Sequence, residues 1–494
     1  MFLTRGREAV VTAPATSPGF LAHAGGPVWS PLSYWGASML LLVLIVGQLV
    51  DMQRPLSLDH CAHYLVALSA TMGTLSTSTL IGLVLSWAVP HYLVTTMRTA
   101  QSDVTVRHSQ WDTWAGFGSV ALLVVGAVAT TAAQRGSLYL VQVGPGLAFG
   151  ALAGAAALRL LVWPLAGGSG RWWQLHANYL TSGFFLWLRL GIALDANTQL
   201  LSRPALALVL VLMLGLIAGP RQGKSRVVPY GFGYWLAIGL LAPALDPARG
   251  FSISLLVATQ LLLSLLILPD SPATWRDEQP RHWAAWVAWG SLAGLLFTCG
   301  FAIHWAFAQI CYRTGGLGLV GLASLAFLVN ALRLGRYLIH PPAMPATQRD
   351  ETTPPRGTLK LLPVAALLVL LGLWPGVLEH VWPDVRIGLG ALSFRSLWGS
   401  SAGERAALFV ATVLVPASSI LLTRRLPELM PELQNRLHWL NARIQDDWPY
   451  LLAQRLLGWI TGVVRAVLVT IEQVLPVAWS LLWGLALAYY LLQR

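Results

Sequence analysis

Residues 150–164 read Gly150-Ala-Leu-Ala-Gly-Ala-Ala-Ala-Leu-Arg159-Leu-Leu-Val-Trp-Pro164, a small and apolar run that contains one arginine. A helix that is apolar on all faces belongs in a protein core or in lipid. A charge at the bilayer centre costs about 2.5–3.5 kcal/mol on insertion scales, so Arg159 is a candidate for an ion pathway. Proline lacks an amide hydrogen, and Pro164 therefore predicts a broken helix here.

The whole chain has the composition of a membrane protein. Of its 494 residues, 56% are hydrophobic and 11% are charged, and its mean hydropathy is +0.62. Soluble proteins carry about 25% charged residues. This composition excludes a water-soluble enzyme. Because a membrane helix needs only about 20 apolar residues, the chain is long enough for many crossings.

Apolar runs separated by proline, glycine and charge recur along the chain. We expect an all-α, polytopic integral membrane protein with about 14–15 transmembrane helices, since each crossing needs about 20 residues. Two of these helices should be broken, and a C-terminal amphipathic helix should lie along the membrane surface. The predicted spans are 33–51, 61–76, 79–97, 113–133, 141–164, 172–194, 205–220, 229–247, 251–269, 283–299, 300–314, 316–339, 359–378, 405–423 and 468–491.

The charge balance is basic, with 32 Lys and Arg against 20 Asp and Glu, a net charge of +12. In a membrane protein such a balance indicates cytoplasmic-side loops and anionic lipids rather than nucleic acid. Only Lys224 and Lys360 are lysines, and no lysine lies inside an apolar run. The three cysteines are far apart and form no CxxC pair, so no metal site, disulfide framework or cofactor is expected.

Three ionisable residues inside the predicted spans are the main site candidates: Arg159, His176 and His304. Histidine titrates near neutrality and can pass a proton, which arginine cannot. Two alternatives stay open, because Arg159 could extend to the membrane interface and His176 could be a neutral histidine bonded to a neighbouring helix. The supporting polar side chains are Asn178, Tyr179, Thr181, Ser182 and Gln309, and Gly300 marks a second broken helix.

Four motifs in this order resemble the antiporter-like membrane subunits shared by respiratory complex I, membrane-bound hydrogenases and Mrp-type cation/proton antiporters. The family has Lys-x-x-x-x-Pro where this chain has Arg159 to Pro164, followed by a helix similar to Leu175-His176-Ala177 through Gly183 and Arg189. A later broken helix resembles Gly300-Phe301-Ala-Ile-His304-Trp305. The turn near the family's C-terminus is similar to Leu370-Leu-Gly-Leu-Trp-Pro-Gly376.

The chain also departs from the family pattern at charged positions. The family usually has Trp-Glu in an earlier helix, and its glutamate pairs with the lysine of the first broken helix. Here Trp87 is followed by Ala88, and Thr259 and Leu263 stand where the family often has histidine and lysine. Arg159 would then be a fixed positive charge, and proton movement would depend on His176, His304 and neighbouring polar groups.

The resemblance implies a proton- or cation-translocating subunit of a multisubunit complex, multi-pass in a bacterial inner membrane, with other membrane subunits and anionic lipids as partners. One alternative is a non-conducting structural subunit. Another is the membrane partner of an inorganic-carbon uptake system, with a soluble carbonic-anhydrase-like zinc protein. This chain has no active site of its own, although the complex could be an NADH-quinone oxidoreductase.

The resemblance to antiporter-like subunits also implies how the chain divides into segments. We expect no cleaved signal peptide, because residues 1–32 form a polar tail without a continuous apolar core. The segments after the tail are a first antiporter-like bundle at 33–220, a second at 221–345, C-terminal helices at 346–423, an amphipathic surface segment at 424–467 and a final transmembrane helix at 468–494.

Overall fold

The structure is a computed structural model of the whole chain. It describes residues 31–51, 58–77, 79–100, 106–133, 146–166, 173–193, 227–267, 283–339, 361–377, 402–419, 421 and 462. Three predicted segments lie outside these ranges apart from Gly462: the span at 205–220, the surface segment at 424–467 and the final helix at 468–494.

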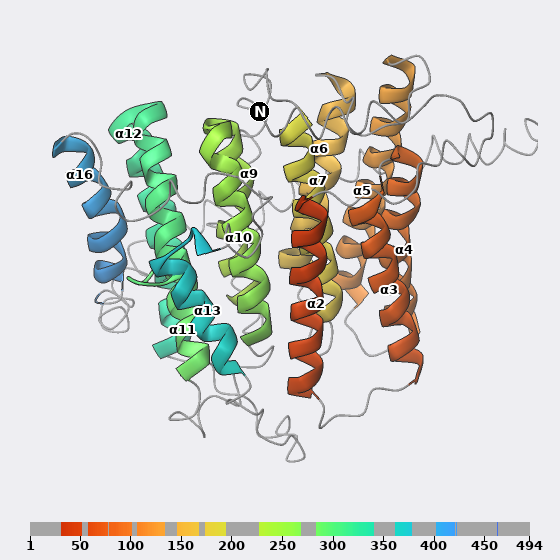
Figure 1. Ribbon diagram of the computed structural model, residues 1–494, viewed down its shortest axis with the longest axis horizontal. Helices are drawn as coiled ribbons and strands as arrows, with labels where there is room; N and C mark the ends of the chain where they lie inside the picture. The colour runs from red at the N-terminus through yellow and green to blue at the C-terminus, as the bar shows by residue number, and fades with distance from the viewer. Residues whose placement is uncertain are drawn as a thin grey trace, which may run out of the picture.

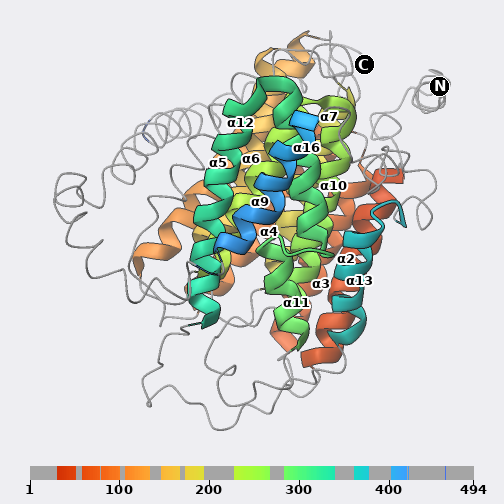
Figure 2. The same cartoon turned by 90° about the vertical axis from the view of Figure 1, so that its left-hand side faces the viewer.

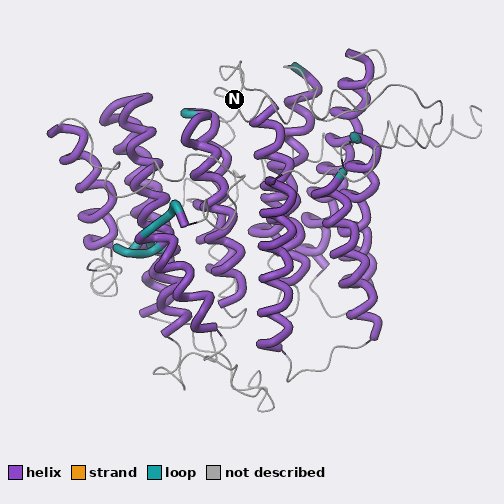
Figure 3. Tube along the Cα trace, in the orientation of Figure 1, coloured by secondary structure: helices purple, strands orange, loops and turns teal. Residues whose placement is uncertain are grey.

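The described residues form helices and no strand, as Figure 3 shows, which confirms the all-α class. Their positions follow the apolar runs of the sequence, because a segment without a polar face can satisfy its backbone only within a helix. The helices are α2 (Pro31–Asp51), α3 (Leu58–Ser76), α4 (Leu80–Ala100), α5 (Val106–Ala133), α6 (Leu147–Ala166), α7 (Trp173–Ala193), α9 (Val227–Leu245), α10 (Pro247–Ile267), α11 (Trp283–Leu292), α12 (Cys299–Ile339), α13 (Leu362–Leu373), α16 (Ala402–Phe409) and the π-helix η8 (Val410–Leu414).

The helices stand side by side in two groups (Figure 1). In the first group, α6 packs against α5 and α7, α3 against α4, and α2 against α7. In the second group, α9 packs against α10 and α12, and α13 packs against both α11 and α12. Helix α16 and η8 cover one side of α12, as the view in Figure 2 shows.

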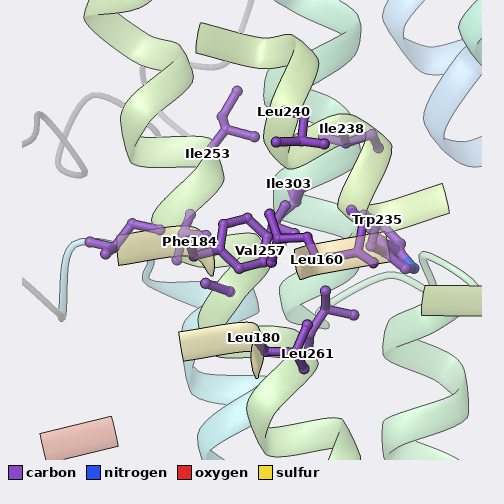
Figure 4. Packing of buried hydrophobic residues seen from close by; sticks show 14 of the residues in the cluster. Leu160, Leu180, Phe184, Trp235, Ile238, Leu240, Ile253, Val257, Leu261 and Ile303 are labelled. Atoms are coloured by element: carbon purple, nitrogen blue, oxygen red, sulfur yellow. The ribbon is translucent and has the colours of Figure 1, made fainter. Parts of the chain in front are cut away.

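The two groups meet through apolar side chains from α6, α7, α9, α10 and α12 (Figure 4). Phe184 of α7 lies so close to Gly239 of α9 that a Cβ on Gly239 would be 2.8 Å from the phenylalanine ring, and Val257 of α10 borders the same place. Leu160 and Ile303, the chain neighbours of Arg159 and His304, belong to this apolar contact as well.

One helix of the second group is broken in its middle. Helix α11 ends at Leu292 and α12 begins at Cys299, and the intervening loop lies partway along the helical layer (Figure 3). The predicted break therefore lies directly before Gly300. Helix α12 has a further kink at Gly316, with φ 63° and ψ −153°, where the sequence predicts the boundary between spans 300–314 and 316–339.

The predicted break at Pro164 is wrong. Helix α6 stays helical through Pro164 and ends two residues later, at Ala166. A proline so close to the end removes a hydrogen bond only from the last turn, so the helix ends there without an interior break.

Two helices among the described residues are long and apolar enough to cross a membrane by themselves, Arg249–Ile267 and Cys299–Leu332. Seven shorter apolar helices, of 10–17 residues, accompany them: Leu32–Val43, Leu65–Ser76, Leu80–Tyr92, Gly116–Thr130, Leu147–Leu160, Phe232–Leu245 and Leu362–Leu373.

We expect Gly372 of α13 to be essential for the close contact between α13 and the loop that joins α11 to α12. A Cβ on this glycine would lie 2.6 Å from the carbonyl oxygen of Phe297, inside the loop between α11 and α12. Overpacking of this kind costs about 1–3 kcal/mol. Gly372→Ala should therefore lower the thermal unfolding temperature of the detergent-purified protein.

Gly318→Ala is the matched control, because the space around Gly318 is open to 4 Å. Equal unfolding temperatures for the two variants would contradict this account of the α13 contact.

Candidate functional site

Arg159 of α6 lies inside the first group of helices, with 2% of its surface exposed. Its Nη1 donates a hydrogen bond of 2.7 Å to the carbonyl oxygen of Trp87 in α4. The guanidinium carbon lies 4.2 Å from the centre of the Trp87 ring and 4.9 Å from that of Tyr179 in α7. The Arg159 side chain is therefore enclosed by the helices of the first group and does not extend along the protein surface.

Two hydrogen bonds hold the Trp87 ring in place under the guanidinium. Its Nε1 donates to Oγ of Ser119 in α5 at 2.9 Å, and this hydroxyl donates to the carbonyl of Ala155 in α6 at 2.8 Å. On the other side, the Tyr179 hydroxyl is 3.5 Å from Nδ1 of His91 in α4. Helices α4, α5, α6 and α7 thus all contribute to the position of Arg159.

No carboxylate of the described residues pairs with Arg159. Its contacts with the described residues are the one hydrogen bond and the two aromatic rings, and Nε and Nη2 have no hydrogen-bond partner among them. A desolvated cation–π contact contributes about 2 kcal/mol, whereas burying an ion costs several kcal/mol. Ala88 follows in the sequence the tryptophan that accepts this hydrogen bond, so the residue next to Trp87 in the chain carries no charge.

His176 lies in the first turn of α7, and its side chain is outside the described part of the structure. The polar residues that follow it are buried. Asn178 is fully buried with neither amide atom hydrogen-bonded to a described residue, and the same holds for the Thr181 hydroxyl. Ser182 donates back to the carbonyl of Asn178 at 2.7 Å. The role of His176 stays a prediction.

His304 lies in the second group of helices, in α12, with 1% of its surface exposed. The hydroxyl of Tyr234 in α9 is 3.2 Å from its Nδ1. Phe327, from the later part of α12, stacks on the imidazole with ring centres 4.0 Å apart and an angle of 18° between the planes. Tyr234 was not among the residues that the sequence singled out, because its neighbourhood reads as a uniformly apolar span.

Hydrogen bonds of the Ser291 and Gln260 side chains connect the two halves of the broken helix, α11 and α12, near His304. The amide of Gly300 donates to Oγ of Ser291 at 3.1 Å, and Nε2 of Gln260 donates to the Ser291 carbonyl at 3.2 Å. The first amides of a helix have no partner within it, and Ser291 supplies one here. Helices α10, α11 and α12 are thereby fixed together four residues before His304.

A charged network lies farther along α12 and was missed in the sequence. Gln309 donates to Glu404 of α16 at 3.2 Å, and its carbonyl accepts a bond of 3.4 Å from Arg249 of α10. Arg313 forms an ion pair with the same carboxylate at 3.3 Å. Glu404 is 4% exposed. In the sequence it reads as a charge at the end of an apolar run, where a solvated side chain is the normal expectation.

We predict that Ala88→Glu supplies the carboxylate that Arg159 lacks and raises the free energy of unfolding. Removing one partner of a buried ion pair costs about 3–5 kcal/mol, so a newly formed pair should return energy of this order. A double-mutant cycle with Arg159→Met tests the pairing, measured by denaturant unfolding in detergent.

The gain from Ala88→Glu should vanish when residue 159 is Met. If the glutamate stabilises the protein equally in both backgrounds, or in neither, then Ala88 does not face the guanidinium.

Three solved structures share this arrangement of helices at low sequence identity. A chain of the Mrp complex from Dietzia sp. DQ12-45-1b aligns with a TM-score of 0.63 and 15% identity, over 88% of this chain and 55% of that one. The present chain thus spans about half the length of that relative. A chain of respiratory complex I from Thermus thermophilus aligns with a TM-score of 0.56 and 21% identity, over 77% and 91% of the two chains.

A chain of the membrane-bound sulfane sulfur reductase, an archaeal respiratory membrane complex, aligns with a TM-score of 0.56 and 16% identity, over 93% of both chains. No protein-family model matches the sequence, and no curated protein matches it either. The protein has the fold of subunits from the Mrp, complex I and sulfane sulfur reductase membrane complexes, consistent with the antiporter-like subunits that its motifs resemble.

Proposed function

We propose that this protein is an antiporter-like subunit that moves protons or cations across a bacterial inner membrane as part of a multisubunit complex. The observation that carries the proposal is the pair of buried sites, one in each group of helices. Arg159 lies on the rings of Trp87 and Tyr179, and His304 lies between Tyr234 and Phe327. Intramembrane ionisable groups are costly, and they tend to be kept for function.

The two sites would have different roles. Arginine keeps its proton, so Arg159 would act as a fixed positive charge that repels cations or orders water. An imidazole can take up and release a proton and a guanidinium does not, so His304 and His176 would carry the proton itself. In this proposal the chain crosses the membrane about 14–15 times, since each crossing needs about 20 residues. Other membrane subunits and anionic lipids surround it.

The network around Glu404 gives the proposed pathway a continuation beyond His304. Gln309 lies five residues after the histidine on α12 and connects Arg249 with Glu404. Glu404 also stands in the first turn of α16, where the helix dipole favours a negative charge. A carboxylate that can take up and release a proton would link the buried imidazole to the outside through Gln309.

A second function, a non-conducting structural subunit, is favoured by the contact between the two groups. Leu160, Phe184, Val257 and Ile303 fill this contact with apolar side chains (Figure 4). Such packing has no groups that relay a proton between the Arg159 and His304 sites. The flux measurements below separate the two functions.

We expect His304→Gln, His304→Ala and His176→Ala to reduce ion movement by the assembled complex at least tenfold. Gln keeps the approximate size and polarity of the imidazole but cannot titrate, so its effect reports the lost proton carrier. The measurement is proton or cation flux into proteoliposomes that contain the native complex, with assembly checked by subunit composition.

Thr130→Val serves as a control, because the Thr130 hydroxyl is buried and donates within its own helix, to the Gly126 carbonyl at 2.7 Å. Flux equal to that of the unmodified complex in all three histidine variants would favour the structural role instead.

For the continuation of the pathway we predict a severalfold lower flux in Glu404→Gln with little loss of stability. Glutamine can still accept the bond from Gln309 but cannot exchange a proton. Arg313 is 42% exposed, and ion pairs at such positions contribute about 0–1 kcal/mol. Flux in proteoliposomes should fall while the unfolding temperature stays within a few degrees. An unchanged flux would remove Glu404 from the pathway.

A further inference from the structure

The guanidinium of Arg159 has one edge that makes no hydrogen bond to a described residue. Its Nη1 is used in the bond to the Trp87 carbonyl, while Nε and Nη2 are buried and have no hydrogen-bond partner among the described residues. These two nitrogens lie along one edge of the planar guanidinium group, and their N–H bonds point outward from it in parallel. This is the edge with which arginine binds carboxylates and related oxyanions in a bidentate manner.

The surroundings of the guanidinium favour occupation of this edge by an anion. Its faces are covered by the rings of Trp87, at 4.2 Å, and Tyr179, at 4.9 Å, so the Nε–Nη2 edge is the part of the cation that has no acceptor among the described residues. The rings attract the cation but accept none of its in-plane hydrogen bonds. A buried donor without an acceptor is costly, and a buried cation without a counter-charge is more so.

The described residues supply no carboxylate here. Ala88 is the residue next to the tryptophan that binds Arg159. The buried carboxylate of Glu404 pairs with the partly exposed Arg313 in another part of the fold. Two further buried polar groups, the amide of Asn178 and the hydroxyl of Thr181, have no partner among the described residues. They are close to Tyr179 in the sequence of α7.

We propose that Arg159 anchors a buried binding site for a small, planar, monovalent oxyanion, of which formate and bicarbonate are examples. Two oxygens on one carbon match the spacing of Nε–H and Nη2–H, which a spherical halide cannot do. One negative charge balances the one positive charge of the guanidinium. The site is independent of the proposed ion transport, because it requires only that the anion binds at equilibrium.

The experiment is equilibrium dialysis of the purified full-length protein against radiolabelled formate at pH 8, with unlabelled bicarbonate, chloride and sulfate as competitors. We expect saturable binding of one formate per chain, displaced by bicarbonate. Chloride and sulfate should compete at least tenfold more weakly, because neither offers two coplanar oxygens on one monovalent centre.

Four variants locate the site. Arg159→Met should abolish binding, and Arg159→Lys should weaken it at least tenfold, since lysine keeps the charge but has no fork. Ala88→Glu should also abolish binding, because the new carboxylate would occupy the edge. Arg189→Lys is the matched control and should bind like the unmodified protein, since Arg189 uses its Nη1 on the Thr77 carbonyl at 2.6 Å.

Three results would overturn the proposal: no saturable binding to the unmodified protein, binding that survives Arg159→Met, or equal competition by chloride and formate. Equal formate affinity in Arg159→Lys would also overturn it, because binding would then depend on the positive charge alone and not on the two parallel N–H donors of arginine. Helical circular dichroism and a single chromatographic peak establish that each variant is folded, and Ala88→Glu keeps the test decisive if Arg159→Met does not fold. A loss of ion flux with intact formate binding would refute the transport function alone.

Discussion

In an apolar layer each backbone amide needs a partner within the protein, and the break between α11 and α12 is where this constraint is hardest to meet. The amide of Gly300 uses the Ser291 hydroxyl, and Gln260 binds the Ser291 carbonyl. Phe297 has a φ of 66°, which costs a bulky residue about 1–3 kcal/mol. Gly372 packs on its carbonyl. The position of His304 depends on these contacts, because the histidine lies one helical turn beyond the break.

The two buried sites are built alike but differ in the group that each holds. Both place an ionisable side chain against an aromatic ring and a tyrosine: Trp87 and Tyr179 around Arg159, Phe327 and Tyr234 around His304. Arginine cannot release its proton under physiological conditions, whereas histidine can. Charge can therefore change by protonation at the second site only.

Within the described residues the sequence predicted most of the helices, because a membrane helix is defined by the hydropathy of its own residues. It also singled out Arg159 and His304, which are both buried, since a charge within an apolar run is conspicuous. It could not predict the rings of Trp87 and Tyr179 under the guanidinium, which come from α4 and α7. Glu404 was missed because its burial depends on Gln309 and Arg313, more than 90 positions away. Pro164 was misread because only the length of α6 shows that the proline lies in its last turn.

The absence of a titrating partner at Ala88 changes how the two groups of helices could influence each other. In a lysine–glutamate pair, proton transfer at one group shifts the proton affinity of the other. Arg159 has no such partner among the described residues, and apolar side chains lie between the two groups of helices (Figure 4). In this chain, an anion that binds to or leaves the Nε–Nη2 edge of the guanidinium would thus change the net charge of the Arg159 site, as protonation of the carboxylate does in a lysine–glutamate pair.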